Sequence, residues 1–165
     1  MANPMNNISY GLFVVTTKNQ AKHNGCITNT VMQVTTTPNV ITLAVNKQNY
    51  THDLIMESKI FNVSIISEKA NFELFKHFGF QSGRDVDKFD GFTDCKLASN
   101  GLYYITKGVN TVISAKVIKT EDLGTHTLFI GEVKDAGVLK QGQALTYDYY
   151  HHVIKGKTPA GATHS

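Results

Sequence analysis

The stretch ISYGLFVVT, residues 8–16, carries the pattern that decides the fold. Successive side chains of a strand point to opposite faces, so Ile8, Tyr10, Leu12 and Val14 are expected to line one face of a strand. Similar runs of apolar and β-branched residues predict further strands at residues 26–36, 40–45, 60–66, 101–106, 109–120 and 126–134. The sequence therefore predicts about seven strands.

The composition supports a mainly β chain. Val, Ile and Thr make up 44 of the 165 residues, whereas Ala and Leu together make up 20. Side chains branched at Cβ are stiff and pack well on a pleated surface, so this bias favours strands over helices. A chain of this length forms a single domain as a rule, and we expect that domain to span residues 1–155, followed by a small, polar C-terminal tail at 156–165.

Two short helices are expected between the strands. Thr51 is a suitable N-cap for a helix ending near residue 58, and Ser67 is a suitable N-cap for a helix over 68–78 that Gly79 ends. The dipeptide Asn24-Gly25 predicts a tight turn. Residues 80–100 form a long loop rich in Gly, Asp and Ser, and loops of that length in a compact domain are often functional. The whole pattern indicates an antiparallel barrel, closed or partly closed, with helices inserted.

Several function classes are disfavoured by the sequence. The net charge of +3 is mild and the lysines are scattered, so we expect no nucleic-acid partner. No apolar run is long enough for a membrane helix, and residues 1–7 do not resemble a secretory signal. Cys26 and Cys95 have no partner motif, so we expect reduced thiols and a cytoplasmic location. The seven histidines are dispersed, so no metal site is expected. With so few acid–base groups, the chain is either a binding module or an enzyme whose chemistry is carried by a cofactor.

Three polar clusters are unusual for a barrel. The first is the pair of segments TNT and QVT at residues 28–30 and 33–35, and the second is KQNYTH at residues 47–52. The third consists of Ser82, Gly83, Arg84 and Lys88 in the long loop. Cations, hydroxyls and helix-start N–H groups favour an anion. Each cluster alone also fits a capped turn or a solvated loop, but together they favour one phosphorylated ligand.

The order of these motifs resembles the flavin reductase-like, FMN-binding split-barrel family, from about residue 8 to residue 159. Within it, the chain is similar to the flavin domains of high-molecular-weight rubredoxins and to flavoredoxins, although no Cys-x-x-Cys module follows Pro159. The segments that carry the resemblance are YGLFVVT at 10–16, NGCITNT at 24–30, QVT at 33–35, NKQNYTH at 46–52, FGFQSGRD at 78–85, DKF at 87–89, GTHTLFIGEV at 124–133 and LTYDYYH at 145–151. The resemblance implies a mainly β, antiparallel split β-barrel with two or three short helices.

The resemblance also implies roles for individual residues. The isoalloxazine ring and ribityl chain of FMN would lie against Thr28, Asn29, Thr30, Gln33, Val34 and Thr35. The FMN phosphate would lie among Lys47, Asn49, Tyr50, Thr51, Ser82, Gly83, Arg84 and Lys88. The nicotinamide of NAD(P)H would lie near His126, Tyr147 and Tyr150. For His126 a simple strand-end hydrogen bond remains an alternative, and for the two tyrosines core or dimer packing does.

The function implied by the resemblance is an FMN-dependent oxidoreductase that passes electrons from NAD(P)H to flavin and then to an acceptor. In such an enzyme the flavin carries the chemistry, and no side chain is expected to act as a catalytic group. An alternative is an FMN electron-transfer module reduced by a protein partner, without direct NAD(P)H activity. A homodimer is expected, as is a possible redox partner protein of the rubredoxin or ferredoxin kind.

Overall fold

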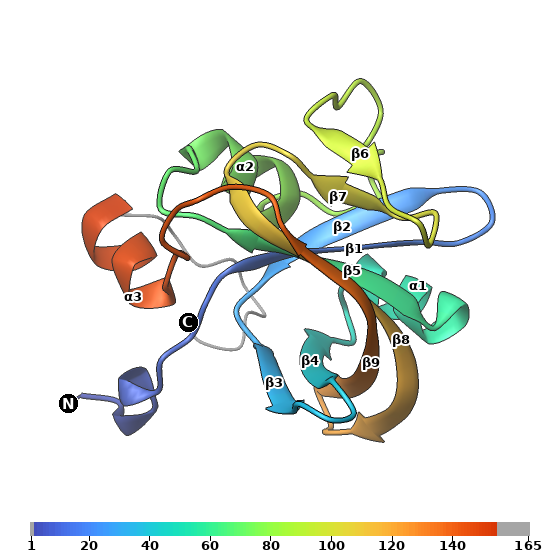
Figure 1. Ribbon diagram of the computed structural model, residues 1–165, viewed down its shortest axis with the longest axis horizontal. Helices are drawn as coiled ribbons and strands as arrows, with labels where there is room; N and C mark the ends of the chain where they lie inside the picture. The colour runs from blue at the N-terminus through green and yellow to red at the C-terminus, as the bar shows by residue number, and fades with distance from the viewer. Residues whose placement is uncertain (1, 155–165) are drawn as a thin grey trace.

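The computed structural model describes residues 2–154, which fold around one seven-stranded antiparallel sheet (Figure 1). Its strands are β1 (Phe13–Lys18), β2 (His23–Thr28), β3 (Val31–Thr35), β4 (Val40–Asn46), β5 (Ile60–Ile66), β8 (Val109–Asp122) and β9 (His126–Val138). A separate hairpin pairs β6 (Cys95–Leu97) with β7 (Tyr103–Ile105). The helices are α1 (Tyr50–Ser58), α2 (Phe72–Gly79) and α3 (Tyr147–Tyr149), with 3₁₀ and π turns at Pro4–Asn7 and Tyr150–Ile154.

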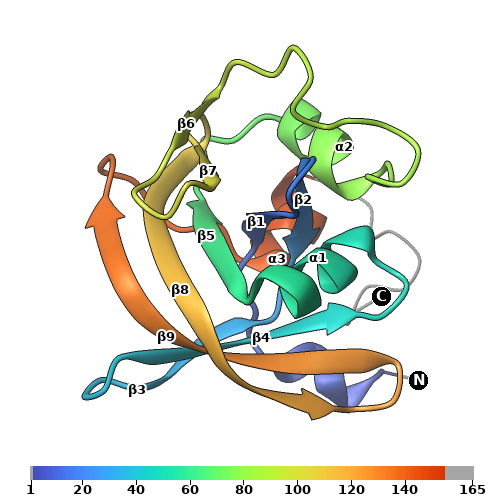
Figure 2. The same ribbon diagram turned by 90° about the vertical axis from the view of Figure 1, so that its right-hand side faces the viewer.

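The sheet curls into a barrel that is open on one side. Its strand order is β2-β1-β5-β8-β9-β4-β3, so β2 and β3 form the two edges although they are consecutive in the chain. Residues 29–30 connect these edges, and the long β8–β9 hairpin curves around the barrel wall (Figure 2). This arrangement confirms the prediction of a mainly β, antiparallel split barrel with three short helices.

Buried side chains form two core clusters on either side of the sheet. Phe13, Val15, Phe61 and Phe129 belong to the cluster inside the barrel. Val14 points the other way, into a second cluster to which α2 contributes Phe75 and the π turn after α3 contributes Tyr150. Strand β1 is therefore buried on both faces, which explains why apolar residues follow one another from Phe13 to Val15 instead of alternating with polar ones.

The structure corrects the predicted first strands. Strand β1 begins at Phe13, because the backbone before it pairs with the C-terminal segment: Tyr10 O accepts the N–H of Tyr147 at 2.8 Å. The Asn24-Gly25 turn is wrong, since Asn24 is fully buried within β2. The turn lies at residues 19–22, where Asn19 Oδ1 accepts the N–H groups of residues 21 and 22. The predicted strand at 26–36 is two strands, because the chain crosses there between the sheet edges.

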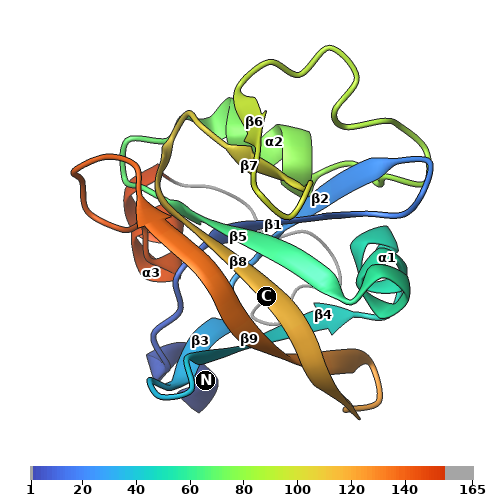
Figure 3. The same ribbon diagram turned by 45° about the vertical axis from the view of Figure 1, so that its right-hand side comes forward.

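The two predicted helices exist with different caps (Figure 3). The N-cap of α1 is Asn49, whose Oδ1 accepts the N–H of Thr51 at 2.9 Å, so Thr51 is not the cap. Helix α2 begins four residues later than predicted, with Asn71 at its N-cap position. Ser67 cannot cap it, because the N–H of Ser67 donates to Gly108 O and the N–H of Glu68 donates to Gln143 O, so both residues pair with other segments.

Candidate functional site

The N-terminal end of α1 meets the long loop and strand β2, and this contact brings several predicted phosphate residues together. Thr51 is fully buried, and its Oγ1 accepts a hydrogen bond from Asn24 Nδ2 at 2.9 Å. Asn24 Oδ1 is also buried and has no hydrogen-bond partner within residues 2–154. The start of α1 is thereby fixed to β2, with the positive end of the helix dipole beside the loop.

Gly83 lets the long loop approach this point closely. A Cβ atom placed on Gly83 would lie 2.2 Å from Asn24 Oδ1, a separation too short for any other residue without a shift. The Lys22 ammonium donates a hydrogen bond to the Gly83 carbonyl oxygen and lies 5.4 Å from the centre of the Tyr50 ring. The loop backbone is therefore held between β2 and α1 by a glycine and a lysine.

Arg84, the next residue of the loop, also lies near Tyr50 at the start of α1. Its guanidinium lies 5.1 Å from the centre of the Tyr50 ring and donates to Asp53 Oδ2 at 2.6 Å. Burial alone would raise the pKa of Asp53, but hydrogen bonds from His52 and Arg84 bring that pKa below its ordinary value. Ser82 Oγ accepts the N–H of Arg84 at 3.1 Å, which fixes the loop turn.

We call this set of residues the phosphate cluster. Its members are Lys22, Asn24, Tyr50, Thr51, Ser82, Gly83 and Arg84. Two cations, three hydroxyls and a helix start make it a set of donors suited to a phosphate group.

Lys47 and His126 lie together at a second place, the turn between β8 and β9. Lys47 Nζ donates to Asp122 Oδ1 at 2.6 Å, and the Lys47 N–H donates to Thr125 O at 2.9 Å. His126 pairs with Asn46 across the sheet, and its Nδ1 lies 2.9 Å from Thr125 Oγ1. Burial lowers the pKa of His126, which favours the neutral form of its imidazole.

The opening of the barrel carries the residues predicted to contact the flavin ring. Thr28 Oγ1 lies 2.8 Å from Thr30 Oγ1, which donates to Ala44 O at 2.7 Å. Asn29 between them is buried. Strand β3 pairs with β4 alone among the described strands, so the backbone of Gln33, Val34 and Thr35 forms a sheet edge. Gln33 Nε2 donates to Asn39 Oδ1 at 2.8 Å, and the Val34 side chain is exposed.

Three predicted residues lie apart from these groups. Lys88 is buried, and its ammonium donates to Gly25 O and Phe78 O, so its donors are directed to backbone carbonyl groups and not to the predicted phosphate position. Tyr147 and Tyr150 are buried in the cluster under α3, where Tyr150 packs on Phe75 at 4.6 Å between ring centres. Helix α3 lies well away from the β8–β9 turn that carries His126 (Figures 1 and 3).

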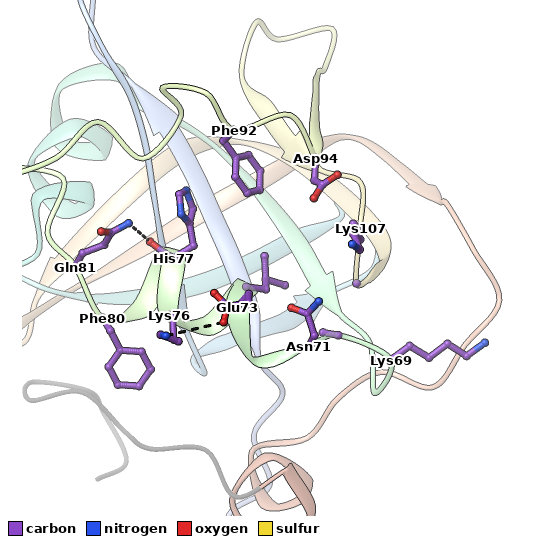
Figure 4. Close-up of a pocket in the computed structure, with 13 residues that line it drawn as sticks. Lys69, Asn71, Glu73, Lys76, His77, Phe80, Gln81, Phe92, Asp94 and Lys107 are labelled. Carbon is purple, nitrogen blue, oxygen red and sulfur yellow. Dashed lines mark hydrogen bonds and ion pairs between the residues drawn. The ribbon is translucent and has the colours of Figure 1, made fainter.

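A cavity of about 650 Å³ lies beside α2 and does not involve the predicted flavin residues. Figure 4 shows its lining, in which Lys76 pairs with Glu73 and Gln81 donates to the His77 carbonyl oxygen. The remaining lining residues are Lys69, Ala70, Asn71, Leu74, Phe80, Phe92, Asp94, Lys107 and Gly108. None of the helices in the range 2–154 is both long and apolar enough to cross a membrane.

Sequence reasoning missed four residues of the site region: Lys22, Asn24, His52 and Asp53. The Asn24-Gly25 pattern predicts a turn. In the structure Asn24 lies two residues before the buried Cys26, on the same face of β2. His52 and Asp53 follow Thr51 directly, and a buried His beside an Asp at a helix start could have been noticed as a hydrogen-bonded pair. Lys22 carries no signal in the sequence, because only the fold brings it to the loop.

Comparison with known proteins places this chain in a family. A family model described as flavin reductase like domain matches residues 5–155. The chain is 44% identical over 156 residues to a ferric-chelate reductase (NAD(P)H) of Archaeoglobus fulgidus, covering 94% of this chain and 92% of that protein. It is 41% identical over 158 residues to a high molecular weight rubredoxin of Moorella thermoacetica, covering 96% of this chain and 69% of that protein.

A solved structure has the same fold. The FMN-binding protein from Thermus thermophilus with bound 1-cyclohex-2-enone superposes with a TM-score of 0.77 at 21% identity, covering 89% of this chain and 86% of the other. Because the family model matches nearly the whole chain, this chain belongs to the flavin reductase like domain family and is a flavin-type oxidoreductase.

Proposed function

We propose that the chain binds FMN and passes electrons from NAD(P)H through the flavin to a further acceptor. The observation that carries this proposal is the phosphate cluster at the start of α1, where Lys22 and Arg84 flank Tyr50 beside the Gly83 backbone. The curated relative from Archaeoglobus fulgidus is named for NAD(P)H, and the Thermus thermophilus structure is named for FMN. Both names support the proposal.

The phosphate of FMN fits the donors that this cluster presents. A phosphate monoester carries close to two negative charges at neutral pH, which two cations and a helix N-terminus balance. Arg84 donates from Nη2 to Asp53 Oδ2. The other N–H groups of its planar guanidinium remain as donors for phosphate oxygens. The Ser82 hydroxyl accepts a backbone N–H, so its own O–H remains available as a donor. Riboflavin lacks the phosphate and would gain none of these contacts.

The ring and ribityl chain of FMN would be held at the opening of the barrel. The hydroxyls of Thr28 and Thr30 and the edge backbone of Gln33 to Thr35 offer donors and acceptors to the polar end of a flavin. The Asn29 side chain is buried between the two edges. Asn49 fixes the start of α1, so its role is to hold the phosphate cluster in shape.

FMN, when bound, supplies the hydride-accepting chemistry, and the chain supplies positioning. Hydride transfer needs the two reacting atoms roughly 3 to 3.5 Å apart, so a residue that orients the nicotinamide raises the rate. His126 is the proposed orienting residue, since its imidazole stands at the start of β9, directly before the mainly apolar run at residues 127–130. Lys47, two residues from the N-cap of α1, would attract the phosphates of NAD(P)H, although Asp122 already pairs with it.

The acceptor and the assembly are also part of the proposal. The Moorella thermoacetica relative is named a high molecular weight rubredoxin, and this name supports an iron-containing, rubredoxin-like redox partner. Met32 and Val34 are exposed on the edge strand β3, with 63% and 45% of their surface accessible, which supports burial of this edge in a homodimer.

Anaerobic titration of the FMN-loaded protein with NADH and with NADPH tests the proposal. Loss of the oxidised flavin absorption on adding either nucleotide supports direct NAD(P)H activity. A protein that binds FMN but is reduced only by a reduced protein partner would instead fit the electron-transfer module. A protein that does not bind FMN at micromolar concentration contradicts both.

A further inference from the structure

Four side chains form one hydrogen-bonded chain across the N-terminal half of α1. Thr127 Oγ1 lies 2.7 Å from His52 Nε2, and His52 Nδ1 lies 3.0 Å from Asp53 Oδ1. The other carboxylate oxygen of Asp53 accepts from Arg84 at 2.6 Å. The chain thus runs from strand β9, one residue after His126, to the loop that carries the phosphate cluster.

The chemistry of these groups assigns a direction to each hydrogen bond. An ionised carboxylate only accepts, so His52 Nδ1 must donate its proton to Asp53. In a neutral imidazole Nε2 then accepts, and the Thr127 hydroxyl donates to it. Each group in the chain is satisfied by its neighbour, and the arrangement allows only one tautomer of His52.

This set of four side chains has a buried half and a half-exposed half. His52 and Thr127 are buried, with exposed fractions of 8% and 5%, and the His52 ring also packs on Phe129. The side chains of Asp53 and Arg84 are about half exposed. A half-exposed ion pair holds its geometry weakly on its own. Because His52 is fixed in the core, its hydrogen bond restricts the orientation of the Asp53 carboxylate. The carboxylate in turn restricts the orientation of the Arg84 guanidinium.

We propose that His52 is a positioning residue that orients Arg84 toward a phosphate ligand through Asp53. This inference rests on the proposed function, because it assumes that the phosphate cluster receives the FMN phosphate. His52 does not touch the ligand. Its effect is confined to the phosphate end, so it governs preference for FMN over riboflavin rather than affinity for flavins in general.

Two substitutions at one position separate this role from simple packing. In His52→Asn the amide nitrogen stands near the place of Nδ1 and can still donate to Asp53. In His52→Gln the amide stands near Nε2, where it can bond Thr127 but not Asp53. Thr127→Val removes the hydroxyl with little change of shape on a strand. Thr42→Val, on the neighbouring strand β4, is the control, because Thr42 is not one of the four hydrogen-bonded side chains.

The measurement is the dissociation constant of FMN and of riboflavin for each variant, by flavin fluorescence quenching, with thermal unfolding to confirm the fold. His52→Gln should reduce the FMN-to-riboflavin affinity ratio by roughly two- to tenfold, less than the loss of a direct hydrogen bond to the charged phosphate, because His52 acts only through Asp53 and Arg84. His52→Asn and Thr42→Val should keep the wild-type ratio, and Thr127→Val should lower it slightly. In an Arg84→Ala background, His52→Gln should leave the ratio unchanged.

Other outcomes overturn the inference. A folded His52→Gln variant with the wild-type ratio, or with equal losses for both flavins, would show that His52 does not act through Arg84. If His52→Gln does not fold, an unchanged ratio in Thr127→Val and a lowered ratio in His52→Asn would contradict the inference. A wild-type protein that binds FMN without preferring it to riboflavin would refute the placing of the FMN phosphate in the phosphate cluster, whereas a wild-type protein that binds no FMN would refute the proposed function itself. Nitrogen NMR of the flavin-free protein gives an independent check, since it must show a proton on Nδ1 of His52.

Discussion

The ammonium of Lys88 lies 2.7 Å from the carbonyl oxygen of Gly25 and 3.0 Å from that of Phe78. These contacts join the long loop to an edge strand and to the C-terminal end of α2, where a positive charge is favoured by the helix dipole. Lys88 is only 3% exposed, and burial lowers its pKa from the ordinary lysine value. The loop that carries Ser82, Gly83 and Arg84 is therefore anchored by a buried cation behind it.

Replacing Lys88 by Met should destabilise the protein. The substitution keeps most of the apolar stem but leaves two buried carbonyl groups without their donor, which outweighs the relief of no longer burying a charge. We expect the free energy of unfolding to fall by roughly 1 to 3 kcal/mol in urea denaturation. The exposed Lys96→Met should change it by less than about 0.5 kcal/mol. A Lys88→Met protein as stable as wild type would contradict this account of the loop.

Arg84→Ala should weaken FMN binding while leaving riboflavin binding nearly unchanged. Loss of a charge-assisted contact to the phosphate costs on the order of 1.5 to 3 kcal/mol, or roughly 10- to 150-fold in dissociation constant. Fluorescence quenching with both flavins measures it, with Lys119→Ala, an exposed cation paired to Glu121, as the control. Equal weakening of both flavins would mean that Arg84 only supports the loop.

His126→Ala should slow flavin reduction by NAD(P)H and leave FMN affinity close to wild type. His126 lies at the β8–β9 turn, whereas the phosphate cluster is built from residues of the long loop, the start of α1, strand β2 and the turn before it. Stopped-flow reduction at several nucleotide concentrations separates the rate constant from nucleotide saturation. His152→Ala, an exposed residue at the far end of the chain, serves as the control. If neither quantity changes, His126 makes only a strand-end hydrogen bond.

Stability should decrease as the pH falls below neutrality, and His23 should account for part of the loss. Burial, then the charge of Lys18, lowers the pKa of His23 below its ordinary value, and its Nδ1 is buried without a partner in the described residues. Between the lowered folded pKa and about 6.5 the unfolded chain binds more protons, so stability rises with pH through this window. Denaturation curves at pH 5 and pH 7 should differ less in His23→Gln than in wild type. An equal difference in both proteins would exclude His23 as a cause.

Much of the fold could be predicted from the sequence because local pattern and burial agree. The run at 60–66 became β5 with the predicted bounds, since its β-branched residues fill both cores. Prediction failed where distant contacts decided the local structure. Asn24-Gly25 has the chemistry of a turn, but Asn24 Nδ2 donates to Thr51 from a neighbouring element, and this contact keeps it in a strand. The strand pattern alone did not decide whether the barrel is closed or partly closed. The resemblance to a family predicted the split barrel.

The candidate site was predictable to a similar extent. Tyr50, Thr51, Ser82, Gly83 and Arg84 meet as the anion-binding chemistry of their segments suggested. Lys88 departs from expectation because a lysine side chain is long enough to reach into the core when carbonyl groups receive it. The ion pair of Arg84 with Asp53 could not be seen in the sequence, since 31 residues separate them.

The central claim is that this chain is an FMN oxidoreductase supplied by NAD(P)H, and one measurement tests it most directly. The purified protein is loaded with FMN, freed of unbound flavin, and titrated anaerobically with NADH and NADPH while its absorption spectrum is recorded. We predict about one FMN retained per chain and loss of the oxidised flavin band on addition of at least one nucleotide. Failure to retain FMN, or a bound flavin that neither nucleotide reduces, would contradict the claim.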